Sequence, residues 1–217
     1  MTENISFCLL CFTSFFSLIN PLGVMPVFMT MTNSLEVVEQ QRTARKAIVF
    51  AFGTMLLFAF SGQLLFSFFG ISVDSFRLVG GIIFFQMGSD MLQARLGKVK
   101  VTKDEVKEYV TDISVTPLAI PMICGPGAIT NSIVLMEDAS TFVKQVILIT
   151  TMFVVCLLTY LVLHMSSRIT KLLGETGNKI MMRLMGLIVM VIAIEFFLSG
   201  LHPILAKIFP TVVTMPS

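Results

Sequence analysis

Charged residues are scarce in this chain of 217 residues: Asp, Glu, Lys and Arg make up 13% of it, against about 25% in an ordinary soluble domain. Hydrophobic residues make up 55%, and the mean hydropathy is +0.91. A core of this size cannot hide so much apolar surface from water, so we expect a lipid bilayer to solvate much of it. This composition excludes a soluble enzyme, a nucleic-acid-binding protein and a disordered chain.

Residues that usually carry chemistry are also few. The chain has no Trp, two Tyr, two His and four Cys. The cysteines (Cys8, Cys11, Cys124 and Cys156) all lie in apolar stretches, which argues against the disulfide framework of a secreted domain. His164 and His202 are too few to support hydrolytic chemistry. We therefore expect no enzyme activity, no cofactor and no metal site.

Long uncharged runs predict an all-α membrane protein with six transmembrane helices. A helix that crosses about 30 Å of hydrocarbon needs about 20 apolar residues. Four runs have no charge at all, and two more contain one acid each, Asp90 and Glu195. The runs lie between Glu3 and Glu36, Lys46 and Asp74, Asp112 and Glu137, and Lys144 and Arg168, with Leu78–Ala94 and Leu184–Ala206 as the other two.

The distribution of Lys and Arg predicts the orientation, because cytoplasmic loops are enriched in them. Twelve lie in or beside the loops after the first, third and fifth predicted helices, and three lie on the other side. We expect a multi-pass protein of the cytoplasmic (inner) membrane with both termini outside. The twelve are Arg42, Arg45, Lys46, Arg95, Lys98, Lys100, Lys103, Lys107, Arg168, Lys171, Lys179 and Arg183; the three are Arg77, Lys144 and Lys207.

Three matches at an offset of about 105 residues indicate an internal repeat. Pro21 and Pro126 are 105 residues apart, as are Asp90 and Glu195, and the RLVGG that begins at Arg77 returns 106 residues later as RLMGL. We expect one transmembrane domain, 1–217, built from three-helix repeats 1–97 and 113–217 around a cytoplasmic linker, 98–112. Because three is odd, the second repeat must be inverted, a common plan of secondary transporters.

Prolines predict breaks in the first and fourth helices. Pro21 and Pro26 lie in the first, and Pro117, Pro121 and Pro126 in the fourth; each removes a backbone donor. Irregular backbone at membrane depth is tolerated where it is buried or lines a wet cavity. A lone proline is more simply a kink, but paired breaks favour a binding site. The candidate substrate-binding residues are Asn20, Pro21, Gly23, Gly125, Pro126, Gly127, Thr130 and Asn131.

Asp90 and Glu195 are candidate coupling residues. A charged carboxylate at the centre of a membrane helix costs about 2.5–3.5 kcal/mol on insertion scales, so such residues are usually paired or functional. An interfacial position, or an ion pair such as Asp90 with Arg95, is the structural alternative. We expect Glu195 to exchange a proton during transport.

The proline motifs resemble those of the MarC family of integral membrane proteins. Residues 20–28 (NPLGVMPVF) are similar to its first-helix motif, and 117–121 (PLAIP) with 125–130 (GPGAIT) to its fourth-helix motif. Residues 70–72, 76–81 and 183–186 match its third and sixth helices, so the resemblance covers essentially the whole chain. It implies a six-helix transporter of small neutral amino acids, grouped with the LysE-type exporters.

The leading hypothesis is therefore a secondary transporter. Its substrate is expected to be a small polar or zwitterionic solute, with a neutral amino acid as the best candidate. A membrane thiol–disulfide electron conduit is an alternative because Cys124 precedes the Gly125-Pro126 break, but the position symmetric to it is Ile19. A multidrug exporter is the other alternative, since 16 Met and 20 Phe can line an apolar pocket. The expected partners are the substrate and the bilayer, and homo-oligomerisation stays open.

Overall fold

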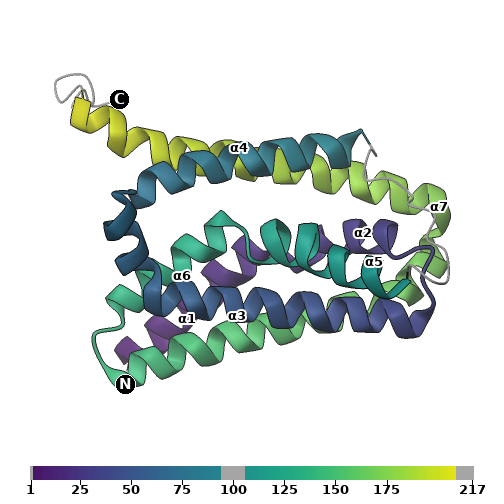
Figure 1. The fold of residues 1–217 in the computed structure, drawn as a ribbon, viewed down its shortest axis with the longest axis horizontal. Helices are drawn as coiled ribbons and strands as arrows, with labels where there is room; N and C mark the ends of the chain where they lie inside the picture. The colour runs from purple at the N-terminus through teal and green to yellow at the C-terminus, as the bar shows by residue number, and fades with distance from the viewer. Residues whose placement is uncertain (1, 94–105, 209–217) are drawn as a thin grey trace.

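The computed structural model describes residues 2–93 and 106–208, and every regular element in these two ranges is helical (Figure 1). The prediction of an all-α protein is therefore confirmed for the described chain. The helices, in order, are α1 (Thr2–Ile19), α2 (Pro21–Met31), α3 (Val37–Phe69), α4 (Val73–Leu92), α5 (Val106–Ile113), η1 (Ser114–Ile123), α6 (Pro126–Asp138) and α7 (Phe142–Ile208).

The helices form two layers. In Figure 1, α4 and the C-terminal part of α7 lie together along one side, and α1, α2, α3, α5, α6 and the first part of α7 form the other. The long α7 turns from one layer into the other at Gly174, where φ is 67°. A residue with a Cβ rarely adopts this left-handed conformation, so glycine suits the turn.

Four helical segments are long and apolar enough to cross a membrane, and a bent pair makes five. They are Glu3–Met31, Val37–Phe69, Phe142–Ser166 and Lys179–Ile208, with Val110–Ile123 and Pro126–Asp138 meeting at 59° as the fifth. This number is lower than the six predicted membrane helices because α4 is not among the segments. Its 20 residues include Asp74, Arg77 and Asp90, and these charges lower its hydropathy, although 20 residues are about 30 Å long.

Glycines let α4 and α7 pack closely. A Cβ at Gly81 would lie 2.8 Å from the carbonyl oxygen of Ala193, and one at Gly186 would lie 2.8 Å from that of Gly88. These two contacts are related by one offset, because Gly81 and Gly186 are 105 residues apart, as are Gly88 and Ala193. Helix interfaces in membranes are built from such small residues because they let backbones approach.

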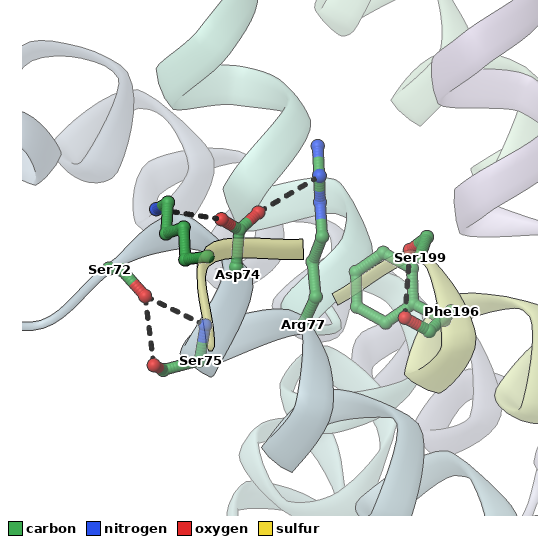
Figure 2. Close-up of polar contacts among 7 residues, drawn as sticks. Ser72, Asp74, Ser75, Arg77, Phe196 and Ser199 are labelled. Carbon is green, nitrogen blue, oxygen red and sulfur yellow. Dashed lines mark hydrogen bonds and ion pairs between the residues drawn. The ribbon is translucent and has the colours of Figure 1, made fainter. Parts of the chain in front are cut away.

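One ion pair joins the start of α4 to the end of α7 (Figure 2). Asp74 Oδ1 lies 3.5 Å from Arg77 Nη1, and Asp74 Oδ2 lies 3.9 Å from Lys207 Nζ. Ser72 caps α4, since its Oγ accepts a hydrogen bond of 3.0 Å from the Ser75 N–H. The start of α4 is thereby fixed beside the end of α7.

The backbone of η1, the segment before α6, is irregular because of its two prolines. In η1, Thr116 and Ile120 have extended backbone angles, with φ of −128° at both. Each precedes a proline, Pro117 or Pro121, and proline disfavours helical angles in the residue before it. The predicted linker 98–112 is in part helical, because α5 begins at Val106; positions 98–105 lie outside the described residues.

Candidate functional site

The first membrane segment breaks at Asn20, as predicted. Asn20 adopts a left-handed conformation (φ 46°, ψ 68°), which Asn tolerates better than most residues, and its Oδ1 accepts a hydrogen bond of 3.2 Å from the Gly23 N–H. Pro21 then opens α2 at a position where no backbone donor is needed. Pro26, by contrast, lies inside α2 without ending it.

The second break lies at Gly125, where α6 begins with Pro126. The N-terminal turn of a helix leaves its first N–H groups without intrahelical partners, and in α6 these are the N–H groups of Gly127 and Ala128. The N-cap residue is Gly125, which has no side chain that could cap them. Both of these residues are buried. The two restarts are equivalent in sequence, since Pro21 and Pro126 are 105 residues apart.

The two breaks approach each other. A Cβ at Gly127 would lie 2.9 Å from Cδ2 of Leu18, in the last turn of α1. A Cβ at Gly125 would overlap the Phe84 ring and lie 2.5 Å from the Pro121 carbonyl oxygen. The second break therefore lies beside the last turn of α1, close to the first break, and the expected position of both near the membrane midplane stays a prediction.

A small cavity of about 30 Å³ lies at this point, between the two layers. Its volume is room for about two water molecules. Two pairs of its lining residues are 105 residues apart, Phe84 with Val189 and Met87 with Ile192. The lining residues are Leu18, Ile19, Asn20, Gly23, Val24, Phe84, Met87, Met122, Val189 and Ile192.

The structure divides the predicted site residues into three groups. Asn20 and Gly23 line the cavity themselves, and the buried Pro21 lies between them. Gly125 contacts Phe84 and Gly127 contacts Leu18, both of which line the cavity. Pro126 packs against Gly80 of α4.

Thr130 and Asn131 lie one turn further along α6, on the helix side that carries Gly127. Thr130 is 2% exposed. Thr130 Oγ1 and Asn131 Nδ2 have no hydrogen-bond partner within the described chain. Leaving such a buried group unpaired costs about 1–3 kcal/mol, so these two polar groups are free to bind something else.

The two candidate coupling acids do not line the cavity. Asp90 is half-buried, and Arg95, its suggested ion-pair partner, lies outside the described residues. Glu195 is exposed on the outer face of α7, beside Val191 and Leu198, which are 63% and 49% exposed. Their roles in coupling stay a prediction.

The cysteines are free thiols, three of them buried. The described ranges contain no group of three or more His, Cys, Asp or Glu side chains arranged to hold a metal ion. The one polar side chain among the cavity's lining residues is the Asn20 amide, while the unpaired Thr130 hydroxyl and Asn131 amide lie on α6, outside the lining.

Sequence reasoning missed the apolar half of the cavity wall. The sequence pattern does not distinguish an apolar residue that lines a cavity from one that faces lipid. It therefore did not identify the five apolar lining residues Phe84, Met87, Met122, Val189 and Ile192. The repeat offset contained a usable signal: residues of α4 and α7 at equivalent positions face the same cavity.

Known proteins resemble this chain along almost its full length. Residues 5–205 match the model of the MarC family integral membrane protein. A UPF0056 membrane protein of Pyrococcus horikoshii is 37% identical over 201 residues, covering 93% of this chain and 97% of its own. The UPF0056 membrane protein YvbG of Bacillus subtilis is 36% identical, covering 93% and 99%. No solved structure matches. The chain therefore belongs to the MarC family of integral membrane proteins.

Proposed function

We propose that this protein is a secondary transporter of a small zwitterionic solute, best a neutral amino acid. The observation that carries the proposal is the approach of two interrupted helices beside one small pocket, which Asn20 and Gly23 line and whose lining residues Leu18 and Phe84 contact Gly127 and Gly125. Discontinuous helices at the interface of two repeats are the usual substrate site of secondary transporters. On this proposal the chain is a carrier and not an enzyme.

The chemistry of the breaks favours a substrate with a carboxylate. The free N–H groups of Gly127 and Ala128 lie at the positive end of α6, where an anion is stabilised. The unpaired Thr130 hydroxyl and Asn131 amide lie one turn away. An ammonium group needs acceptors instead, and carbonyl oxygens around the Asn20 and Gly125 breaks provide them. A small side chain suits walls made of Phe84, Met87 and Met122.

The size of the cavity supports alternating access. A volume of about 30 Å³ holds about two water molecules, and even the smallest amino acid is larger. Substrate binding therefore requires the layer of α4 and residues 179–208 to move relative to the other helices. Phe84 and Met87 on one layer and Met122 on the other would separate in that movement.

An inverted repeat accounts for the paired contacts. The starts of α2 and α6 are 105 residues apart, as are the starts of α3 and α7, and the glycine contacts of α4 and α7 share this offset. A two-fold relation between the halves supports six membrane-crossing segments, with α4 as the third. Such a plan gives the two layers equivalent inward-open and outward-open arrangements.

Proton coupling is proposed through Glu195 or Asp90. Glu195 lies 12 residues before Lys207, about 18 Å along the helix, which places it well inside the bilayer. Acidic residues within membrane spans are rare and are usually paired or functional. Glu195→Gln and Asp90→Asn proteins should lose the pH dependence of uptake, and wild-type rates and pH dependence in both would remove the coupling proposal.

Uptake by proteoliposomes tests the function directly. The purified protein, reconstituted into sealed vesicles, should accumulate a labelled small neutral amino acid under an imposed proton or sodium gradient. An excess of the same unlabelled amino acid should compete, and protein-free vesicles control for leakage. If none of a panel of neutral, acidic and basic amino acids moves through correctly inserted protein, the proposal is wrong.

A further inference from the structure

A second, larger hollow lies on the outside of the helix bundle, away from the site of the two breaks. It is a groove of about 260 Å³ between α3 and the first part of α7. The α3 side provides Arg45, Ile48, Val49 and Phe52, and the α7 side provides Phe153, Cys156, Leu157 and Tyr160. No residue is shared with the cavity at the breaks.

The groove has a closed apolar end and an open polar end. Phe52 and Phe153 meet edge to face, with ring centroids 5.8 Å apart, and close one end. Arg45 and Tyr160 lie at the other end, seven residues away on each helix, which is about 10 Å. Val49, Phe153 and Leu157 are 64%, 53% and 45% exposed, so the groove opens sideways toward the acyl chains of the bilayer.

The polar end lies near the membrane–water interface. Lys144 Nζ is 2.6 Å from Glu3 Oε1, and this ion pair marks the opposite interface. About 20 residues of α7 then cross about 30 Å of hydrocarbon, which brings the helix to His164. Tyr160 lies one turn before that residue, and the two rings are 5.8 Å apart. Tyrosine is enriched at this depth because its ring is apolar and its hydroxyl is polar.

Arg45 is an unused cation at this end. In the described chain it makes no ion pair or hydrogen bond, whereas its neighbour Arg42 pairs with Glu39 at 3.0 Å and Lys46 donates to Thr111 at 2.9 Å. An Arg near the end of a membrane helix extends its long side chain to the headgroup level, where its charge can meet an anion. The phosphate of a lipid headgroup is the anion available at this depth.

We propose that the groove binds one anionic phospholipid of the bilayer. Arg45 pairs with the headgroup phosphate, the Tyr160 hydroxyl and the His164 ring lie at the headgroup level, and one acyl chain lies over Val49 and Leu157 toward Phe52. Because α3 and α7 carry equivalent positions of the two repeats, the bound lipid fills the seam between them. A zwitterionic lipid places the same chain in the groove but offers less net negative charge to Arg45.

Lipid binding is measured by native mass spectrometry of the detergent-solubilised full chain, titrated with phosphatidylglycerol or with phosphatidylcholine of identical acyl chains. Wild-type protein should bind one phosphatidylglycerol about fivefold more tightly than phosphatidylcholine, the preference expected for one basic residue near a membrane surface. Arg45→Gln should remove this preference. Arg42→Gln is the matched control, because Arg42 is already paired, and should retain it.

A second pair of variants tests the groove itself. Val49→Phe fills the groove and should reduce binding of both lipids, whereas Leu57→Phe should not. Leu57 is 60% exposed, two turns further along α3 and outside the groove. Equal binding of the two lipids by wild-type protein, or an unchanged preference in Arg45→Gln, overturns the proposal. So does a dimer of the chain whose formation excludes lipid and is lost in Val49→Phe.

Discussion

At the scale of single residues, the glycines at the second break decide how closely the two halves approach. Gly127 faces the flexible end of Leu18, with Phe196 3.5 Å from the position of a Cβ. The neighbouring Gly125 faces backbone, 2.5 Å from the Pro121 carbonyl oxygen. A methyl group is therefore tolerable at Gly127 if Leu18 shifts, and is much harder to fit at Gly125.

Replacing Gly127 tests the site at a buried position of α6. Gly127→Leu should abolish amino acid uptake, because its side chain would fill the space between the breaks, while Gly127→Ala should retain part of it. Membrane insertion should be unchanged in both. Uptake by proteoliposomes is measured, with Gly53→Leu as control, since nothing lies within 4 Å of a Cβ at Gly53. Wild-type uptake by Gly127→Leu would contradict the proposed site.

Removing the unpaired Thr130 hydroxyl should affect stability and transport in different ways. Thr130→Val keeps the shape and removes a buried group without a partner, so unfolding in detergent should be unchanged or shifted to a higher temperature. The KM for uptake should rise by about twofold to tenfold, the loss of one hydrogen bond to substrate. Ser132→Ala is the matched control, because its Oγ already donates to the Ala128 carbonyl oxygen at 2.7 Å. An unchanged KM in Thr130→Val would exclude Thr130 from the site.

At the scale of helices, bulky substitutions on the α4 side and on the α7 side of their interface should lower the stability of the protein by similar amounts. A Cβ at Gly81 meets the Ala193 backbone, and one at Gly186 meets the Leu92 N at 2.7 Å and the Gly88 carbonyl oxygen at 2.8 Å. Gly81→Val and Gly186→Val should each destabilise the protein by about 1–3 kcal/mol through overpacking.

Thermal unfolding in detergent checks this prediction, with Gly53→Val as the control on an open helix face. Similar losses at Gly81 and Gly186 support equivalent roles in an inverted repeat. A loss at one position only would show that the two contacts are not equivalent.

The helices and their breaks follow from local sequence, and their packing does not. Uncharged runs locate the membrane segments, and Asn20-Pro21 and Gly125-Pro126 locate the restarts because each proline suits the first position of a helix. Pro26 has the same chemistry but does not end α2; a proline inside a membrane helix removes one backbone donor and is tolerated there without ending the helix. The exposure of Glu195 depends on how α7 rotates against α4, which no local pattern specifies.

At the scale of the whole molecule, the first described helix begins at the same end of the long axis at which the last described helix finishes. Figure 1 shows the start of α1 and the end of α7 there, whereas the start of α3 and the turn of α7 near Gly174 lie at the opposite end. In the sequence, the stretches rich in Lys and Arg are the ones that connect helices at this opposite end. The charge bias predicts that this end is cytoplasmic.

Topology reporters test that orientation. Both termini should be outside, because twelve of the 15 Lys and Arg residues belong to the other side and cytoplasmic loops retain such residues. Alkaline phosphatase, active only outside, should work when fused after Ser217, and a fluorescent protein that matures only in the cytoplasm should not. A fusion in the Lys98–Lys107 region should behave in the opposite way. Cytoplasmic activity at Ser217 with outside activity at 98–107 would invert the orientation. It would also move the groove at Arg45 to the outer leaflet, where fewer anionic lipids are available to bind it.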